Sequence, residues 1–212
     1  MIVEFFGMPG SGKTTILNKF IEAQHISGCT VVRGTLDHFS SKKRIFLKLI
    51  NSLFCVLINP SFYFKNFFFF LIDKKENGIN DFINITYLCT RYFKYNNTKK
   101  LVIFDQGLLQ AYWSVLSFSS KKSSYDFAFF KSKIEKVVII ELEESINRQR
   151  LFKRTDNLSR LQQNMKLWNN CRRNYFEVLN YLTSDQCLIY LDSQKELKFN
   201  LHRLESVLSN DK

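Results

Sequence analysis

The stretch GMPGSGKT at residues 7–14 decides the fold of this chain. It matches G-x-x-x-x-G-K-[ST] at every fixed position, which is the pattern of a phosphate-binding loop. The apolar run IVEFF at residues 2–6 precedes the loop, and a helical repeat of apolar residues that begins at Ile16 follows it. Because a phosphate-binding loop joins a strand to a helix, this setting predicts a site for a nucleoside triphosphate.

Each part of the loop has an expected task. The glycines allow the tight turn that points successive backbone N–H groups at the phosphates, and the following helix adds its positive end. We expect Lys13 to reach the β and γ phosphates and the Thr14 hydroxyl to ligate Mg²⁺. The alternative, a glycine-rich turn that matches by chance, is disfavoured by the flanking strand and helix. The residues expected at the nucleotide are Gly7, Gly10, Ser11, Gly12, Lys13, Thr14 and Thr15.

The length and charge of the chain narrow the class of protein. A chain of 212 residues suits a single α/β domain with a segment that covers the substrate. Its 31 Lys and Arg against 19 Asp and Glu give a net charge of +12, which favours anionic partners such as nucleotides, phosphorylated sugars or lipid surfaces. No nucleic-acid motif occurs. The five scattered cysteines form no C-x-x-C pair, and no signal peptide precedes the first strand, so we expect a cytoplasmic protein with reduced thiols.

The middle of the chain, residues 36–96, is predicted to be a helical, aromatic-rich insertion that covers the acceptor. Residues 45–58 carry an apolar helical repeat, Pro60 breaks it, and a Phe-rich run follows at residues 62–72. Neither run is long enough to span a membrane. Two interpretations stay open: two helices packed on the core or on the second subunit of a homodimer, or a basic apolar surface that touches the inner face of a membrane or a lipid-linked substrate.

An acidic residue ends the next predicted strand. Residues 101–104 are uniformly apolar and Asp105 follows them directly. A buried parallel strand delivers such a carboxylate to its C-terminal edge, beside the phosphate loop. We therefore expect Asp105 to contact Mg²⁺ through water or to accept a proton from an acceptor hydroxyl. The alternative is an aspartate that only starts a turn before Gly107.

Two arginines are candidates for contacting an anionic acceptor. Arg33 ends the short predicted strand at residues 30–33, where open α/β sheets keep their ligand crevices. Arg91 lies near the edge of a helical apolar stripe that runs to about Asn96. The alternative for both is a solvated surface position, because arginines are mostly exposed.

The stretch ELEESINRQRLFKR at residues 141–154 follows a fourth predicted strand. It is strongly helical, with acids in its first turn and bases in its last. Arg150 and Arg154 are four residues apart and share a face, where a bound polyphosphate would offset their repulsion; a solvated basic face is the alternative. A fifth strand at residues 187–191 and a capping box of Ser193 and Glu196 follow. The β-α alternation predicts a mostly parallel five-stranded sheet with helices on both faces.

These pieces resemble the P-loop kinase superfamily, specifically its thymidylate-kinase-like and nucleoside-monophosphate-kinase-like branch. The matching stretches are GMPGSGKT at 7–14, VIFDQG at 102–107 and ELEESINRQRLFKR at 141–154. The resemblance implies a three-layer P-loop NTPase sandwich and a lid at residues 148–160. It also implies that Arg150 packs against the donor base or phosphates, and that Arg154 together with Arg160 clamps the transferring phosphoryl group.

The departures from that branch concern the acceptor. Gln106 stands where thymidylate kinases usually carry an arginine, and GTLD at residues 34–37 replaces an R-E-P-G type sequence. The parts that read thymidine are thus unmatched. The run DQGLLQ at residues 105–110 is similar to kinase-like proteins of bacteria, some of them found near surface-polysaccharide genes.

The predicted function is transfer of the γ-phosphoryl group of Mg-ATP to a hydroxyl or phosphate of a small anionic acceptor. Lys13, Asp105, Arg150 and Arg154 are the expected catalytic residues. The alternatives are a P-loop ATPase, against which the N-K-x-D and L-S-G-G-Q motifs are absent, and a nucleotide-dependent regulatory or membrane-associated protein. The residues expected at the acceptor are Arg33, Arg91, Gln106 and Arg160.

Overall fold

The centre of the protein is a parallel sheet of five strands in the order β2-β3-β1-β4-β5. The computed structural model describes residues 1–26, 31–35, 40–72, 78–118, 134–153, 165–182 and 187–209. All neighbouring strands pair in parallel, which confirms the predicted sheet. The strands are β1 Ile2–Phe6, β2 Val31–Arg33, β3 Leu101–Phe104, β4 Lys136–Glu141 and β5 Cys187–Asp192.

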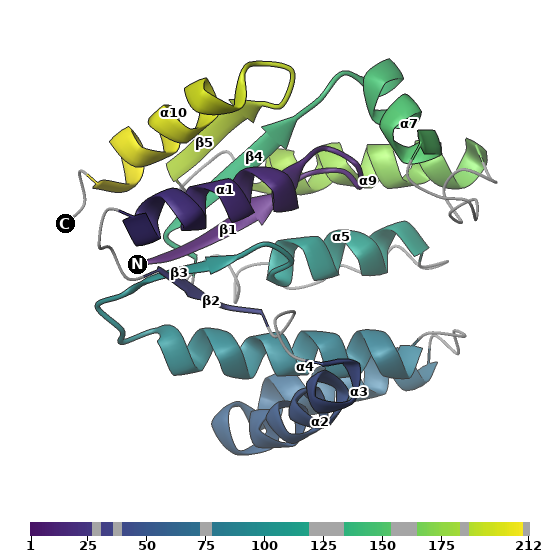
Figure 1. Ribbon diagram of the computed structural model, residues 1–212. Helices are drawn as coiled ribbons and strands as arrows, with labels where there is room; N and C mark the ends of the chain where they lie inside the picture. The colour runs from purple at the N-terminus through teal and green to yellow at the C-terminus, as the bar shows by residue number, and fades with distance from the viewer. Residues whose placement is uncertain are drawn as a thin grey trace.

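Helices cover both faces of this sheet. Helices α1 (Lys13–Ile26) and α10 (Leu197–Ser209) lie together on one face (Figure 1). The other face carries α4 (Gly78–Tyr95), α5 (Leu108–Phe118) and α9 (Met165–Leu182). Helices α2 (Ser41–Ile58) and α3 (Pro60–Ile72) pack on α4, on its side away from the sheet, and α7 (Glu144–Lys153) follows β4. The result is a three-layer α/β sandwich with a helical insertion outside it.

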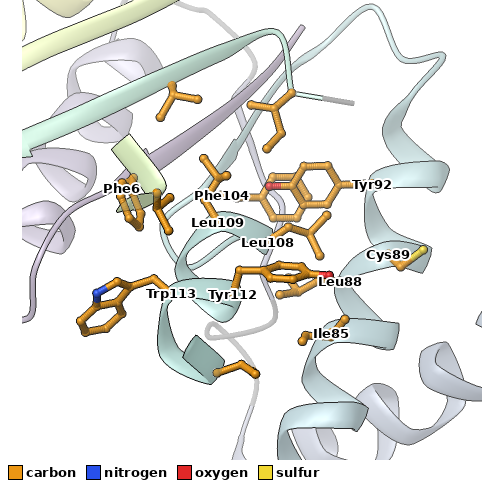
Figure 2. Close-up of a cluster of buried hydrophobic side chains, with 14 of the residues drawn as sticks. Phe6, Ile85, Leu88, Cys89, Tyr92, Phe104, Leu108, Leu109, Tyr112 and Trp113 are labelled. Atoms are coloured by element: carbon orange, nitrogen blue, oxygen red, sulfur yellow. The ribbon is translucent and has the colours of Figure 1, made fainter. Parts of the chain in front are cut away.

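The strands are mostly apolar because both faces of the sheet are buried. In β1, Val3 and Phe5 join the cluster under α1 and α10, whereas Ile2 and Phe6 join the cluster under α4, α5 and α9. Figure 2 shows the second cluster, in which the ring of Tyr92 stacks on that of Phe104 with centroids 4.1 Å apart. This packing fixes α4 and α5 on the sheet beside the end of β3.

Strand β1 is the topological switch point of the sheet. It pairs with β3 on one side and with β4 on the other, so the connections leave it in opposite directions. Open α/β sheets bind their ligands beyond the carboxyl ends of the strands at such a point. The phosphate loop follows β1 there, and Asp105 follows β3 at the same edge.

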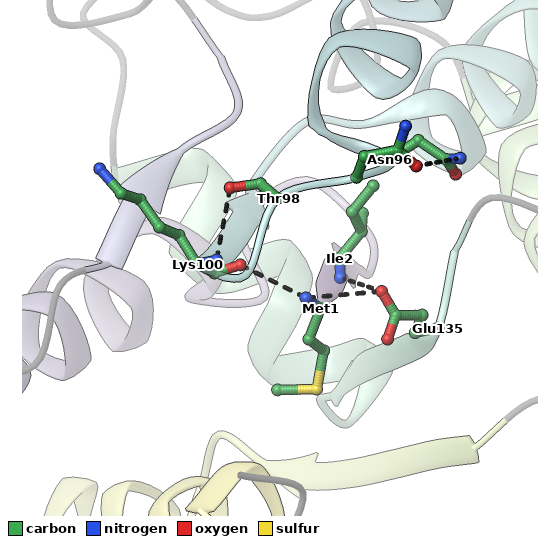
Figure 3. A network of polar contacts seen from close by, with 7 residues as sticks. Met1, Ile2, Asn96, Thr98, Lys100 and Glu135 are labelled. Carbon is green, nitrogen blue, oxygen red and sulfur yellow. Dashed lines mark hydrogen bonds and ion pairs between the residues drawn. The ribbon is translucent and has the colours of Figure 1, made fainter.

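The opposite edge of the sheet is held by a small polar network (Figure 3). The backbone N–H of Ile2 donates to Oε1 of Glu135 at 2.8 Å, and the backbone N–H of Glu135 donates to the carbonyl of Ile2 at 3.1 Å. The backbone nitrogen of Met1 lies 3.3 Å from the carbonyl of Lys100 and 3.6 Å from the Glu135 carboxylate. These contacts tie the segments before β3 and β4 to β1 and so fix the three central strands together.

The structure adjusts the bounds of two predicted helices and contradicts one predicted helix cap. Part of another prediction lies outside the described residues. Residues 45–58 and 62–72 form the expected pair of helices, α2 and α3, which begin earlier at Ser41 and Pro60. Helix α10 begins at Leu197, so Ser193 does not serve as its cap and the predicted capping box is wrong. Residues 154–160 of the predicted lid lie outside the described residues. Among the described helices, none is by itself both long and apolar enough to cross a membrane. Ser41–Ile58 and Pro60–Phe68, which are bent by 118° relative to each other, have that length and apolar composition only as a pair.

Replacing Gly34 by alanine should destabilise the protein. A Cβ at this position would lie 2.4 Å from the ring of Phe104, which is fully buried and stacked on Tyr92 and so cannot yield. We expect a loss of about 1–3 kcal/mol in the free energy of unfolding, measured by urea titration. Gly78→Ala is the matched control, because its Cβ would lie 3.3 Å from the nearest atom, at the start of a helix. Equal losses in the two variants would contradict this assignment.

Candidate active site

The phosphate loop holds its own lysine, Lys13, through hydrogen bonds to backbone carbonyls. Gly10 and Gly12 have φ angles of 85° and 95°, which residues with a side chain seldom adopt. The backbone N–H of Ser11 donates to the carbonyl of Met8 at 3.1 Å and closes the turn. Lys13 Nζ donates to the carbonyls of Gly7 at 2.5 Å and Met8 at 3.1 Å. The ammonium group is thus held at the centre of the loop.

The loop has the shape and the free polar groups that a triphosphate needs. Ser11 Oγ is buried and has no hydrogen-bond partner among the described residues. Thr14 and Thr15 are exposed in the first turn of α1, where helical N–H groups favour an anion. For Mg²⁺, the available ligands are the Thr14 hydroxyl and the Asp105 carboxylate. That set of oxygens suits an ion that keeps several waters and shares the phosphates of its nucleotide.

Asp105 is held by a chain of buried contacts that starts on α4. Its Oδ1 accepts a hydrogen bond from Thr35 Oγ1 at 3.0 Å, and both residues are buried. The carbonyl of Gly34, next to Thr35, accepts a hydrogen bond from Arg91 Nε at 2.9 Å, while Arg91 also donates to the hydroxyl of Tyr95 at 2.7 Å. Arg91 is therefore a support of the turn that positions Asp105.

Two of the arginines predicted at the acceptor, Arg33 and Arg91, form hydrogen bonds outside the cavity. Arg33 donates to Asn18 Oδ1 on α1 at 2.6 Å, and Arg91 is buried behind Gly34. Within the described part of the chain, neither residue lines the cavity beside the phosphate loop. The role of Arg33 and Arg91 as acceptor contacts therefore stays a prediction. Arg160 and Arg154 lie outside the described residues.

A cavity of about 340 Å³ opens beside the phosphate loop. Lys13 lies on its wall together with Gln106, which is exposed directly after Asp105. The remaining walls come from α2, α4 and α5. The side chains that sequence reasoning missed there are Lys48, Asp81, Asn84, Tyr87, Gln110 and Trp113.

The far wall of the cavity is polar in places. Lys48 Nζ donates to Asn84 Oδ1 at 2.7 Å and lies 5.4 Å from the centre of the Tyr87 ring. On α5, Gln110 Oε1 is buried without a hydrogen-bond partner among the described residues, so it can accept one from a ligand. The sequence signal for these residues is weak, because each is one of several polar residues on its helix and no motif distinguishes it from the others.

The buried carboxyl group of Glu4 supports the turn that follows Asp105. Glu4 on β1 is fully buried, its Oε2 accepts from the Tyr92 hydroxyl at 2.6 Å and its Oε1 accepts from the backbone N–H of Gln110 at 3.1 Å. Burial raises the pKa of Glu4 to about 7, although these hydrogen bonds and those from the other first N–H groups of α5 oppose the rise. A Cβ on Gly107 would lie 2.4 Å from the Glu4 carboxyl carbon. The sequence signal was an isolated acid within the apolar run of β1.

Arg150 closes the other side of the phosphate loop. Its two terminal nitrogens donate to Ser193, to Oγ at 3.2 Å and to the carbonyl at 3.3 Å. A Cβ on Gly12 would lie 3.7 Å from Arg150 Nη1, so the guanidinium lies directly over the loop. Helix α7 and the turn after β5 therefore both face the nucleotide site, and Ser193 is a further residue there.

The fold has known relatives among solved structures. No protein-family model matches the sequence, and the comparison with curated proteins finds no match. Deoxyadenosine kinase from M. mycoides with the products dCMP and a flexible dCDP bound has a TM-score of 0.57 at 19% sequence identity, covering 100% of both chains. The same kinase with bound dATP gives 0.57 at 15% identity, and with bound dCTP 0.53 at 14%, each covering 99% of this chain and 100% of that one.

At these identities the likeness shows the fold. The chain has the α/β P-loop fold of nucleoside kinases, with the five-stranded parallel sheet and helices on both faces that the sequence predicts. The neighbours are deoxyadenosine kinases, so the resemblance to the thymidylate-kinase-like branch stays a prediction.

Replacing Glu4 by glutamine should change how stability depends on pH. Because the native pKa is raised from 4.5 to about 7, the stability that this group contributes is full below pH 4.5 and is lost as the pH rises through 7. The shift corresponds to about 3 kcal/mol. Relative to Glu4→Gln, the wild-type chain should therefore lose about 3 kcal/mol of unfolding free energy over that range, measured by denaturant titration.

The control for this experiment is Glu177→Gln, which removes an exposed carboxylate on α9. It should keep the pH dependence of the wild type. An identical pH dependence in the wild type and Glu4→Gln would contradict the assignment of a buried, titrating carboxyl group at position 4.

Proposed function

We propose that this protein is an ATP-dependent phosphotransferase of the nucleoside-kinase type. The observation that carries the proposal is that Lys13 and Gln106 line one cavity, so that a second substrate can lie directly beside the phosphate loop. Phosphoryl transfer needs such a site, because the attacking oxygen must lie in line with the terminal phosphate. The likeness to deoxyadenosine kinases in fold supports the same class of reaction.

The donor is held by the phosphate loop and covered by Arg150. The loop N–H groups and Lys13 neutralise the β and γ phosphates, and their positions are set before the substrate arrives. Arg150, fixed by Ser193, packs on the donor from the opposite side. Thr14 and Asp105 would hold Mg²⁺, which would supply positive charge at the phosphate oxygens. Arg154 and Arg160 complete a lid at residues 148–160 that excludes water during transfer.

The acceptor lies in the cavity under α2, α4 and α5. A volume of about 340 Å³ falls in the range of small-molecule sites and suits a compound of nucleoside size. Trp113 on its wall offers an aromatic ring, and Gln110 Oε1 offers an acceptor for an N–H group such as that of a nucleobase. Asp105, oriented by Thr35, takes the proton from the attacking hydroxyl or organises the metal beside it.

The test is ADP release from ATP in the presence of separate panels of deoxynucleosides, nucleosides, nucleoside monophosphates and sugars. We expect release that depends on one class of acceptor and falls by roughly a hundredfold or more in Lys13→Ala, since a preorganised charge at the transferring group is lost. Lys19→Ala is the control, because Lys19 is exposed on the same helix and pairs with Glu22. ADP release that ignores every acceptor would contradict the proposal and favour a P-loop ATPase.

A second prediction concerns the donor side. Arg150→Ala should raise the KM for ATP by about tenfold or more, because a charged hydrogen-bond donor over the phosphate loop is lost. Steady-state kinetics with varied ATP and varied acceptor will separate this effect from acceptor binding. The matched control is Arg173→Ala, an exposed arginine on α9 that contacts Glu177 and Asn170. An unchanged KM for ATP in Arg150→Ala would remove this residue from the donor site.

A further inference from the structure

The outer side of α2 and α3 carries a large apolar surface, which we call the outer face. Leu57 is 78% exposed, Leu53 65% and Phe46 62%. Both helices pack their inner sides on α4, so their exposed sides point away from the body of the protein (Figure 1). The large apolar residues of the outer face are Ile45, Phe46, Leu49, Leu53, Phe54, Leu57, Ile58, Phe64 and Phe68.

This surface is larger than a soluble monomer ordinarily exposes. With about half of each side chain exposed, the nine residues present on the order of 1,000 Å² of apolar surface, against roughly 300–600 Å² for the largest patch on a typical monomer. Such a patch marks a site of contact with another protein or with a membrane. The area alone would suit a second copy of this chain, which needs about 800 Å² per partner.

The charges around the outer face distinguish between these occupants. Residues 40–72 contain five lysines and arginines in the printed sequence and no aspartate or glutamate. Lys42 and Lys43 are exposed in the first turn of α2, and Lys65 is exposed on α3. Two copies joined through this face would bring the basic residues of both copies together, and residues 40–72 contribute no acid to that interface. An anionic lipid surface offers the opposite charge, at about 1 kcal/mol per basic residue near the surface.

The geometry of the helix pair favours a position along the surface of a bilayer. The two helices are bent by 118° relative to each other, and within the described residues neither is long and apolar enough to span a membrane alone. Helices with an apolar side rich in Phe and Leu and with flanking lysines lie in the plane of the lipid headgroups. The outer face has this composition on α2, and on α3 it carries exposed phenylalanines beside Lys65.

We propose that α2 and α3 bind the surface of an anionic phospholipid bilayer through the outer face. The phenylalanine and leucine side chains enter the boundary between headgroups and acyl chains, and Lys42, Lys43 and Lys65 contact the lipid phosphates. Lys48, on the inner side of α2, continues to line the cavity. Binding therefore leaves the acceptor site within the protein, and it does not depend on the proposed phosphotransfer.

Flotation of the purified 212-residue chain with vesicles tests this proposal. We expect binding to vesicles of phosphatidylcholine mixed with phosphatidylglycerol, much weaker binding to phosphatidylcholine alone, and weakening with added salt. The triple variant Phe46→Ser, Leu53→Ser, Leu57→Ser should bind the mixed vesicles more than about tenfold less well. The double variant Lys42→Gln, Lys43→Gln should lose about 25-fold, since each lysine contributes about fivefold and the two factors multiply.

Two controls separate lipid binding from other effects. Phe176→Ser with Phe199→Ser removes equally exposed phenylalanines on α9 and α10 and should bind as the wild type does. Lys13→Ala, which stops the proposed turnover, should also bind vesicles normally, so failure of one proposal leaves the other intact. All substituted surface side chains are exposed, and thermal unfolding will verify that each variant folds.

The outcomes are decisive in either direction. Binding to mixed vesicles that the triple variant loses and the control keeps supports the proposal. Absence of vesicle binding, or equal binding by the triple variant, overturns it. A wild-type dimer in analytical ultracentrifugation that the triple variant converts to monomer, without vesicle binding, assigns the outer face to a second copy of the chain instead.

Discussion

The parallel pairing of β1 with both β3 and β4 is the constraint on which the candidate site depends. Because all five strands run in one direction, their carboxyl ends lie at a single edge of the sheet. The phosphate loop leaves β1 there, Asp105 leaves β3, and Ser193 follows β5. Arg150, on the helix after β4, reaches that same edge. Segments separated by more than a hundred residues in sequence thus meet around one loop, and each needs only a short extension beyond its strand.

Buried polar contacts then set the turns at this edge. Glu4 holds the first N–H groups of α5, and Thr35 holds the side chain of Asp105. Hydrogen bonds in a low-dielectric interior are strong, and an unsatisfied partner there is costly, so each contact restricts its turn to one arrangement. Arg91 extends this support to Gly34 from the surface of α4. The core of this protein therefore contains polar residues where it meets the site, and those residues orient groups that face the ligands.

The parts of the site that follow local rules could be predicted from the sequence. The phosphate loop is contiguous, and Asp105 directly ends an apolar strand, so both positions follow from residues next to each other in the chain. Lys48 and Gln110 lie on different helices, and only the packing of α2 and α5 around the cavity brings them together. Arg91 is a residue type that often contacts an anionic acceptor. Its burial and its hydrogen bond to Gly34, however, depend on where α4 lies on the sheet. Likewise, Ser193 resembles a helix cap in sequence and bonds to Arg150 because α7 lies beside it.

Helix α2 lines the cavity with its inner side and exposes apolar side chains on its outer side, and this arrangement has a thermodynamic consequence. Lys48 on its inner side contacts Asn84 in the cavity, while Leu53 and Leu57 on its outer side face solvent. A helix moves as a rigid element, so a displacement of the outer side also displaces Lys48. A ligand in the cavity that favours one position of α2 would then change the affinity of the outer face for its partner. By the same linkage, the partner on the outer face would change the affinity of the cavity for the ligand by the same factor. Under the two proposals, helix α2 would therefore link occupancy of the cavity to occupancy of the outer face.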